Sequence, residues 1–381
     1  MMRRVLIVTR FFVRAGTETF LMNNFRHIDR NRFHLDFLVL NGDESPFREE
    51  IERLGGTMVF GHANLAVVKE VIPSIRKIYR IMRRGNYDVV HANCDLVNGC
   101  VLLAARMAGI RTRLSHSHNT DFKEGGGALR RLFYNRVCPW LIRRCATKLL
   151  ACGQQAGIDL YCRDWRGRPS PVDFTVIHNG IDVERFLQAP TAERMAALRQ
   201  ELSIPKGVRV YGNISRYDEQ KNLIYAVEIF QAIHKEDQQA VFILGGIDGP
   251  MKEAVVRKIT ALGLDHVVRE VGERTDLPDL LQLMDCFVLP SLFEGLPFIM
   301  LETQASSLPA VLSAGVPREV DFGLGLLHFV PLSDAPAVWA ERVRQTHRTL
   351  LPAGRIRQTF TERGYHIGES VKTLEKIYEN A

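Results

Sequence analysis

Short apolar runs alternate with longer segments of helical periodicity along both halves of this 381-residue chain. The first half contains the runs Val5–Val8, Phe33–Leu40, Asp88–His91, Thr112–His116 and Lys148–Cys152. A strand, a helix and a further strand in succession predict parallel pairing, because parallel strands need a crossover connection and cannot be joined by a tight turn. The first half is therefore predicted to be a doubly wound α/β domain.

The second half repeats this alternation. Its apolar runs are Val208–Ile214, Ala240–Leu244, Val267–Val271, Cys286–Leu289 and Ala310–Leu312. A domain usually holds about 100–200 residues, so the length predicts two domains. We place a Rossmann-like N-terminal domain at residues 1–173 and a Rossmann-like C-terminal domain at residues 174–365, joined through the Pro- and Gly-containing stretch Arg163–Pro171.

The composition is that of an ordinary globular protein, with 46% hydrophobic and 24% charged residues. It excludes disordered, collagen-like and disulfide-scaffold chains. The seven cysteines include no C-x-x-C pair, which favours reduced, mostly buried thiols in the cytosol. No run approaches the roughly 20 apolar residues that span a bilayer, and Val5–Val8 is too short for a signal peptide. We expect a cytoplasmic protein whose chain does not cross a membrane.

Positive charge is concentrated in the first half. The formal net charge is +7, but residues 1–173 hold 28 Lys and Arg against 16 Asp and Glu, and the remainder carries a net negative charge. Much of the excess lies in Ile75–Arg84 and Arg130–Lys148, which can each form an amphipathic helix with a cationic face. Solvated helix surfaces would explain either segment alone, whereas both together predict attraction to an anionic membrane surface. Nucleic acid is not expected, because no nucleic-acid-binding signature accompanies the charge.

The most specific stretch of the sequence is Cys286–Glu302, which predicts a buried strand, a turn with Glu294 and Gly295, and a helix opened by Pro297. The unpaired N–H groups of the first helical turn form a site for an anionic or oxygen-rich ligand. Carboxylates accept hydrogen bonds from sugar hydroxyls, so Glu294 and Glu302 can hold two polyol groups of one extended ligand, such as a sugar and a ribose. Two surface carboxylates are the alternative interpretation of this pair alone.

In its full context this stretch resembles the signature of the family 4 glycosyltransferases, retaining enzymes of the GT-B fold, with Glu294 and Glu302 at the two acidic positions of the E-x7-E motif. Further matches follow in the family's order: Ala15–Glu18, Ser115–Asn119, Val176–Asp182, Gly212–Tyr217 and Lys221-Asn222. The resemblance implies two Rossmann-like doubly wound domains facing a central cleft, with a terminal helix at residues 366–381 that packs back on the first domain. The chain departs from the family pattern at Ala15, where a paired glycine is common, at Ser306–Pro309 and at Ala314.

Two cations are candidates for the diphosphate of a nucleotide-sugar. Arg216 follows a predicted strand and Lys221 precedes the next predicted helix. A departing diphosphate must have its negative charge neutralised, and cations together with helix amides can do this without a metal ion. Two solvated charges near a turn are the alternative for this pair alone; the resemblance implies that both contact the donor diphosphate. No metal and no cofactor is expected, since the nucleotide-sugar is a substrate.

Other positions of the site follow from the resemblance. Gly16 would let backbone approach the donor. His118 would reach the transferring sugar and support the developing charge, with His116 as its support. A metal site at these histidines is not expected, because no third ligand stands at a suitable spacing. Gly246 would line the nucleoside side of the cleft, and Arg274 would lie near the base.

Within the motif, Glu302 would hold the ribose. Glu294, with the amides that follow Gly295, would orient the sugar. The donor-binding set is completed by the two residues before the helix, Leu296 and Pro297.

The predicted function is metal-independent transfer, with retention, of a sugar from a UDP- or GDP-sugar to a glycan or lipid-linked acceptor in surface polysaccharide biosynthesis, on the inner face of a membrane. A GT-B nucleotide-sugar epimerase and a catalytically silent nucleotide-sugar-binding protein are the alternatives. The E-x7-E context disfavours the epimerase. The presence of Arg216, Lys221, Glu294 and Glu302 disfavours the silent protein.

Overall fold

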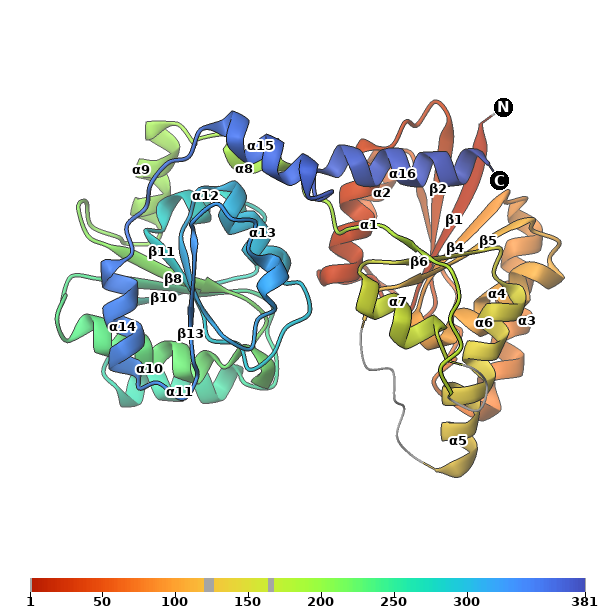
Figure 1. Cartoon of the computed structure of the whole chain (residues 1–381), viewed down its shortest axis with the longest axis horizontal. Helices are drawn as coiled ribbons and strands as arrows, with labels where there is room; N and C mark the ends of the chain where they lie inside the picture. Colours follow the sequence, from red (N-terminus) through yellow and green to blue (C-terminus); the bar gives the residue numbers. More distant parts are fainter. Residues whose placement is uncertain (1, 120–126, 164–167, 381) are drawn as a thin grey trace. The chain divides into compact units, whose positions relative to one another are not determined.

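The computed structural model describes residues 2–119, 127–163 and 168–380, and the chain divides into two compact units. The N-terminal unit comprises Met1–Gly180 together with Ile367–Ala381, and the C-terminal unit comprises Ile181–His366. Residues 164–167 of the predicted joining stretch lie outside the described residues. Each unit is built around one parallel sheet with helices on both faces (Figure 1).

The described part of the N-terminal unit contains a seven-stranded parallel sheet in the order β3-β2-β1-β4-β5-β6-β7. The strands are β1 (Arg3–Thr9), β2 (Phe33–Val39), β3 (Thr57–Phe60), β4 (Val89–Asn93), β5 (Thr112–Ser117), β6 (Lys148–Ala151) and β7 (Thr175–Val176). The residues of the central strand β4 are all buried. Strands buried on both faces are expected to be nearly continuous apolar runs, which is why these segments can be recognised in the sequence.

Helices cover both faces of this sheet. They are α1 (Gly16–His27), α2 (Arg48–Arg53), α3 (Val71–Gly85), α4 (Asn98–Met107), α5 (Ala128–Leu132), α6 (Cys138–Cys145), α7 (Gln154–Tyr161) and α16 (Ile367–Glu379), with 3-10 turns at Val68–Glu70 and Asp95–Val97. Figure 1 shows α3, α4 and α6 on one face and α1 and α16 on the other. The terminal helix α16 is fixed to α1 by a buried hydrogen bond of 2.8 Å from Ser370 Oγ to Asn24 Oδ1.

The C-terminal unit, whose residues 181–366 are all described, contains a six-stranded parallel sheet in the order β10-β9-β8-β11-β12-β13. The strands are β8 (Val210–Ile214), β9 (Val241–Gly245), β10 (Val268–Gly272), β11 (Cys286–Leu289), β12 (Ala310–Ser313) and β13 (Leu327–Val330). The helices are α8 (Val183–Leu187), α9 (Ala192–Glu201), α10 (Leu223–His234), α11 (Lys252–Ala261), α12 (Leu277–Leu283), α13 (Phe298–Ala305), α14 (Pro336–Gln345) and α15 (Ala353–Glu362), with 3-10 turns at Glu219–Lys221 and Arg318–Val320.

Alternating residues of the central strands divide the core of the C-terminal unit into two layers. Phe287 and Leu289 of β11 pack on the face covered by α8, α12, α13 and α15. Cys286 and Val288 pack on the face covered by α10, α11 and α14. This alternation is the two-residue period of a strand.

The observed elements differ from the predicted ones in two informative places. Thr175–Val176, which the sequence analysis assigns to the second domain, pairs in parallel with β6 and completes the first sheet. The helix predicted within Arg130–Lys148 is not a single α-helix, because a π-helical turn at Phe133–Val137 lies between α5 and α6. Pro139 follows this turn directly, and its missing N–H interrupts the hydrogen-bond ladder inside a helical segment that continues from α5 to α6.

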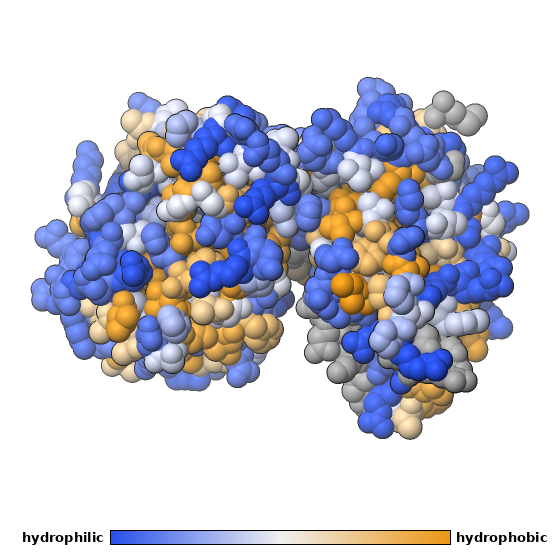
Figure 2. Space-filling view, in the orientation of Figure 1, coloured by the Kyte–Doolittle hydropathy of each residue, from blue (hydrophilic) through white to orange (hydrophobic). Residues whose placement is uncertain are grey.

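Cations and apolar side chains are exposed together on α5 and α6. Leu129, Leu132 and Trp140 are 67%, 56% and 51% exposed, and Arg131 and Arg144 are exposed beside them. Figure 2 shows hydrophilic and hydrophobic residues side by side at the tip of the unit that α5 forms. On α3 the exposed cations are Arg76, Lys77, Arg80, Arg83 and Arg84. None of the described helices has both the length and the apolar composition needed to cross a bilayer.

The two sheets share one strand order, in which the third, second and first strands are followed by the fourth, fifth and sixth. The order reverses between β1 and β4 in the N-terminal unit and between β8 and β11 in the C-terminal unit. In open parallel sheets, ligands bind beyond the carboxyl ends of the strands at such reversal points. The loops that follow these four strands are therefore where functional side chains should be sought.

Gly99 allows α4 to approach α6. A Cβ atom on Gly99 would lie 2.4 Å from the carbonyl oxygen of Cys138. We predict that Gly99→Ala lowers the free energy of unfolding by about 1–3 kcal/mol, because a packed helix must shift. The control is Gly354→Ala in α15, where a Cβ would meet open space; it should leave stability unchanged or raise it by up to about 1 kcal/mol. Urea unfolding followed by circular dichroism measures both, and equal effects would contradict the packing argument.

Candidate active site

A nearly buried ion pair joins the loops that follow β8 and β11. Lys221 ends the 3-10 turn after β8, and its Nζ lies 2.6 Å from Oε1 of Glu294 in the loop after β11. The Glu294 side chain is 5% exposed and that of Lys221 is 16% exposed. Removing either partner would therefore leave the other charge desolvated and uncompensated.

Two further side chains donate hydrogen bonds to Glu294. Ser291 Oγ donates to Oε1 at 2.7 Å, and Gln220 Nε2 donates to Oε2 at 3.1 Å. Both carboxylate oxygens thus have donors inside the unit, which fixes the orientation of the carboxylate without a bound ligand.

Backbone contacts connect the same two loops. Leu292 N donates to the Gln220 carbonyl at 2.8 Å, and Asn222 Nδ2 donates to the Pro290 carbonyl at 3.1 Å. Asn222 adopts a left-handed conformation with φ of 52° immediately before α10, which asparagine tolerates better than most residues. Besides the ion pair, the loops after β8 and β11 are therefore joined by hydrogen bonds of the residues that precede and follow Lys221.

Unpaired backbone donors lie directly after Glu294. In the described chain, no hydrogen-bond acceptor faces the N–H groups of Gly295, Leu296, Phe298 and Ile299. Pro297 is the N-cap of α13 and has no N–H of its own. The start of α13 is thus a set of free donors at the positive end of a helix dipole, directly after the partner of Lys221 in the chain, which suits an anionic group.

Glu302 lies in the second turn of α13 and is half-buried. Burial raises its pKa to about 7, and the positive charge of Arg185 opposes the shift. Among the described residues, Glu302 accepts no side-chain hydrogen bond, unlike Glu294. Its carboxyl group is therefore available to an external donor and close to its own titration near neutral pH.

Arg216, the other predicted diphosphate ligand, lies after β8 in the same loop as Lys221. Its guanidinium forms an ion pair with Asp218, and about half of its side chain is exposed. The structure thus places both predicted cations on one loop, Lys221 turned inward to Glu294 and Arg216 accessible from solvent.

Gly246 and Arg274 have structural partners that the sequence did not reveal. Gly246 has φ of 121°, and a Cβ there would lie 2.2 Å from the Ser215 carbonyl oxygen, so this position requires glycine for the loops after β8 and β9 to approach each other. Arg274 follows β10, two strands from the reversal point, and pairs with Asp276 and Glu201. Their roles toward a donor remain predictions.

His118 lies just beyond β5 in the N-terminal unit. Its Nε2 lies 2.8 Å from Asn93 Oδ1, and its backbone N–H donates to Asp95 Oδ1 at 3.1 Å. The ring packs against Phe20, with 5.4 Å between the centroids. Burial lowers the pKa of His118 to about 3, so the imidazole is neutral near pH 7. It can support a sugar through hydrogen bonding but not through a positive charge.

His116 is part of a buried row of aromatic groups. Its Nδ1 lies 3.1 Å from His91 Nε2, and His91 Nδ1 lies 2.7 Å from the hydroxyl of Tyr378 on α16. The rings of His116 and His118 are 4.1 Å apart between centroids. His116 therefore packs against His118, as its predicted supporting role requires, without sharing a hydrogen bond with it in the described structure.

The N-terminal unit also has polar residues that the sequence analysis did not select. Gly16 opens α1, and Glu18 in the first turn of that helix is buried. Burial, with a smaller contribution from the charge of Asp95, raises the pKa of Glu18 to about 7. Asn93 is the last residue of β4, and Asp95 follows two residues later. Polar residues at the carboxyl end of a buried central strand are the signal that could have identified Asn93 and Asp95.

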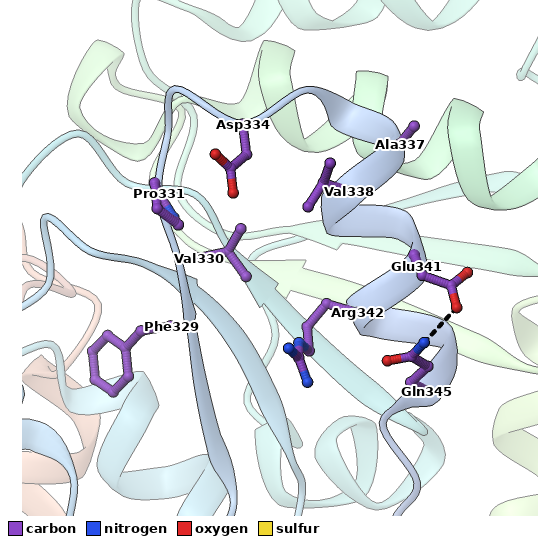
Figure 3. A pocket seen from close by; sticks show the side chains of 9 residues that line it. All are labelled: Phe329, Val330, Pro331, Asp334, Ala337, Val338, Glu341, Arg342 and Gln345. Atoms are coloured by element: carbon purple, nitrogen blue, oxygen red, sulfur yellow. Dashed lines mark hydrogen bonds between the residues drawn. The ribbon is translucent and has the colours of Figure 1, made fainter.

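Outside this region, the C-terminal unit has a groove between β13 and α14, shown in Figure 3. It is lined by Phe329, Val330, Pro331, Asp334, Ala337, Val338, Glu341, Arg342 and Gln345. None of the predicted site residues lines it. The part of the chain that the structure describes also contains no group of three or more His, Cys, Asp or Glu residues suited to a metal ion.

Sequence comparison assigns the chain to a family. Residues 14–185 match Glycosyltransferase Family 4, and residues 208–348 match Glycosyl transferases group 1. EpsF of Bacillus subtilis, named as a glycosyltransferase, is 32% identical over 99% of this chain and 96% of its own length. The chain belongs to the family 4 glycosyltransferases. This glycosyltransferase is also 27% identical, over 66% of its length and 63% of the relative, to the Escherichia coli protein named UDP-Gal:alpha-D-GlcNAc-diphosphoundecaprenol alpha-1,3-galactosyltransferase.

A solved structure confirms the predicted fold. The crystal structure of Anabaena HepE in complex with UDP and glucose matches this glycosyltransferase with a TM-score of 0.75 over 100% of both chains, at 19% identity. The α/β architecture of two Rossmann-like units predicted from the sequence is therefore the GT-B fold.

The pairing of Lys221 with Glu294 can be tested in this glycosyltransferase through a double-mutant cycle. Each single substitution leaves one charge desolvated and without its partner. Lys221→Met and Glu294→Gln should therefore each lower the free energy of unfolding, by up to about 3–5 kcal/mol, which is the range for buried pairs. The double variant should lose less than the sum, with a coupling energy of about 1–3 kcal/mol. Urea unfolding of the four proteins gives the cycle; additive losses would mean that the pair contributes no interaction energy.

Proposed function

We propose that this glycosyltransferase moves a sugar from a UDP- or GDP-sugar to a glycan or lipid-linked acceptor in surface polysaccharide assembly, with retention of anomeric configuration and without a metal ion. The observation that carries the proposal is the Lys221–Glu294 pair beside the free amides that begin α13. A diphosphate needs positive charge and N–H donors, whereas a sugar needs a fixed carboxylate. The loops after β8 and β11 together offer the groups that both ligands need.

The donor-binding roles follow from these contacts. The diphosphate is held by Lys221, the accessible guanidinium of Arg216 and the N–H groups at the start of α13, while Glu302 accepts hydrogen bonds from the ribose. Glu294 orients the transferred sugar, and His118 supplies a neutral hydrogen-bonding group from the N-terminal unit. Gly16, Gly246 and Arg274 complete the proposed donor-binding set.

The proposed chemistry is a substitution at the anomeric carbon. The bond from this carbon to the diphosphate oxygen breaks as the acceptor hydroxyl oxygen bonds to the same carbon from the same face. The hydroxyl proton passes to the departing diphosphate. Lys221, Arg216 and the amides of α13 stabilise the charge that develops on the leaving group, and such preorganised donors commonly contribute several kcal/mol to a reaction barrier. No protein nucleophile is proposed.

The residues of the candidate site disfavour the epimerase and the silent binding protein. An epimerase would need acid and base groups around the sugar, and the carboxylate next to the proposed sugar site, Glu294, is already held by Lys221, Ser291 and Gln220. A silent binding protein would be expected to have lost part of the charged set, yet Arg216, Lys221, Glu294 and Glu302 are all present.

A lipid-linked acceptor is supported by two observations. The Escherichia coli relative is named for a diphosphoundecaprenol-linked sugar. In this chain, α5 and α6 expose Leu129, Leu132 and Trp140 among arginines, as an amphipathic surface that lies on an anionic membrane would. We propose that the N-terminal unit docks through this surface and α3 on the inner face of the membrane.

A panel of UDP-, GDP- and ADP-sugars tests the reaction class. Transfer or slow donor hydrolysis is expected; epimer formation, or binding without turnover, would contradict the proposal in favour of one alternative. Lys221→Ala and Glu302→Ala should each lower turnover or donor affinity at least tenfold, about 1.4 kcal/mol. Lys206→Ala and Glu253→Ala, exposed side chains of the same unit, serve as controls that should retain wild-type kinetics.

Donor affinity should depend on pH through Glu302. Its carboxylate form accepts hydrogen bonds from the ribose, and its pKa in the free protein is about 7. Affinity for the nucleotide-sugar should therefore rise as pH increases through about 7 and fall below it, where the carboxyl is protonated. Calorimetric titration measures this, using the intact donor because its diphosphate, esterified at both ends, does not titrate near pH 7. Glu302→Gln should bind more weakly with a flat profile; an unchanged profile in this variant would refute the assignment.

Membrane docking is tested by sedimentation with anionic and neutral vesicles. The protein should bind anionic vesicles, and Arg83→Glu with Arg84→Glu should lower that binding at least tenfold, since each cation near an anionic surface contributes about 1 kcal/mol. Lys206→Glu with Arg355→Glu changes the net charge equally in the C-terminal unit and should have little effect. Equal, negligible binding to both vesicle types would remove the membrane proposal.

A further inference from the structure

The hydrogen bonds around His118 define its tautomer. We propose that Asn93 is a positioning residue that holds His118 with the proton on Nε2, so that Nδ1 is a hydrogen-bond acceptor for a sugar hydroxyl. The inference rests on the proposed function in one respect, namely that His118 faces a sugar.

Asn93 is buried at the end of β4, between two partners of fixed chemistry. Its Nδ2 lies 2.9 Å from the backbone carbonyl oxygen of His91, and its Oδ1 lies 2.8 Å from His118 Nε2. A carbonyl oxygen can only accept, so the amide nitrogen must face His91. The opposite orientation of the amide would place its oxygen against the carbonyl oxygen of His91 and break that bond.

The proton on His118 follows from this orientation. With the amide nitrogen facing His91, Asn93 presents its oxygen to His118, and an amide oxygen can only accept. Nε2 of His118 must therefore carry a hydrogen, and in a neutral imidazole the other nitrogen is then bare. Burial keeps this ring neutral near pH 7, because it lowers the pKa of His118 to about 3.

The bare Nδ1 is available to a ligand. Within residues 2–119, 127–163 and 168–380, Nδ1 has no hydrogen-bond partner. It is also not one of the polar side-chain atoms that are both buried and without a partner, so a ligand can reach it. The ring cannot turn freely: Asn93 holds Nε2, Asp95 holds the backbone N–H at 3.1 Å, and His116 packs on the ring with 4.1 Å between centroids. A fixed lone pair of this kind selects a hydroxyl and disfavours a carboxylate or phosphate oxygen, neither of which can donate.

The wild-type protein provides the first test. The full chain, labelled with ¹⁵N-histidine, should show a single neutral tautomer for His118 in long-range ¹H–¹⁵N spectra, with the proton on Nε2; His118→Gln identifies the signal. A proton on Nδ1, or a mixture of tautomers, would overturn the proposal. This measurement needs neither a substrate nor a folded Asn93 variant.

The second test separates positioning from packing. Asn93→Leu should lose the single Nε2–H signature and lower turnover of the nucleotide-sugar at least tenfold. Asn24→Leu is the matched control, because Asn24 is an equally buried amide that bonds to Phe20 and Ser370; it should keep both the signature and the turnover. Wild-type turnover in Asn93→Leu, or an unchanged tautomer, would overturn the proposal.

Comparing donor hydrolysis with sugar transfer in Asn93→Leu identifies which hydroxyl group bonds to His118 Nδ1. A loss in donor hydrolysis without acceptor would place the hydroxyl on the transferred sugar, and a loss confined to transfer would place it on the acceptor; both support the role of Asn93. If wild-type protein turned over no nucleotide-sugar while the Nε2–H signature was present, the proposed function would fail and the tautomer assignment would stand.

Discussion

The ion pair between Lys221 and Glu294 is the interaction on which the C-terminal unit's candidate site depends. It brings a cation from the loop after β8 to a carboxylate from the loop after β11, and both side chains are largely withdrawn from water. Such a pair is costly unless further hydrogen bonds are made, and here Ser291 donates to Oε1 and Gln220 to Oε2 of the carboxylate. The residue that directly precedes the unpaired amides leading into α13 is thereby held to the loop after β8.

The same physical arrangement recurs in the N-terminal unit with different residues. There the polar side chains lie beyond β1, β4 and β5, around the same kind of reversal in strand order. The C-terminal unit has an ion pair at this position, whereas the N-terminal unit has a neutral histidine held by Asn93 and Asp95, with the carboxyl group of Glu18 close enough to Asp95 to be affected by its charge.

Local patterns in the sequence were sufficient for much of the fold. Cys286–Leu289 was predicted with its observed bounds, because a buried apolar run between turn residues permits few alternatives. Edge strands were less visible: β3 and β7 are short and partly exposed, so neither has a long apolar run, and β7 was assigned to the wrong sheet.

The E-x7-E spacing identified Glu294, but its partner Lys221 lies 73 residues away in sequence. Spacing cannot reveal such a contact, and the tertiary fold alone creates it. The roles of Asn93 and of Gly246 depend on close approaches between loops for the same reason.

We propose that the diphosphate of the donor binds at Lys221 and the start of α13. A crystal structure of the full chain with UDP tests this binding site. We expect diphosphate oxygens within hydrogen-bond distance of Lys221 Nζ and of the N–H groups of Phe298 and Ile299, with the ribose on Glu302. UDP bound elsewhere, for example in the groove between β13 and α14, with those amides unoccupied, would contradict the account.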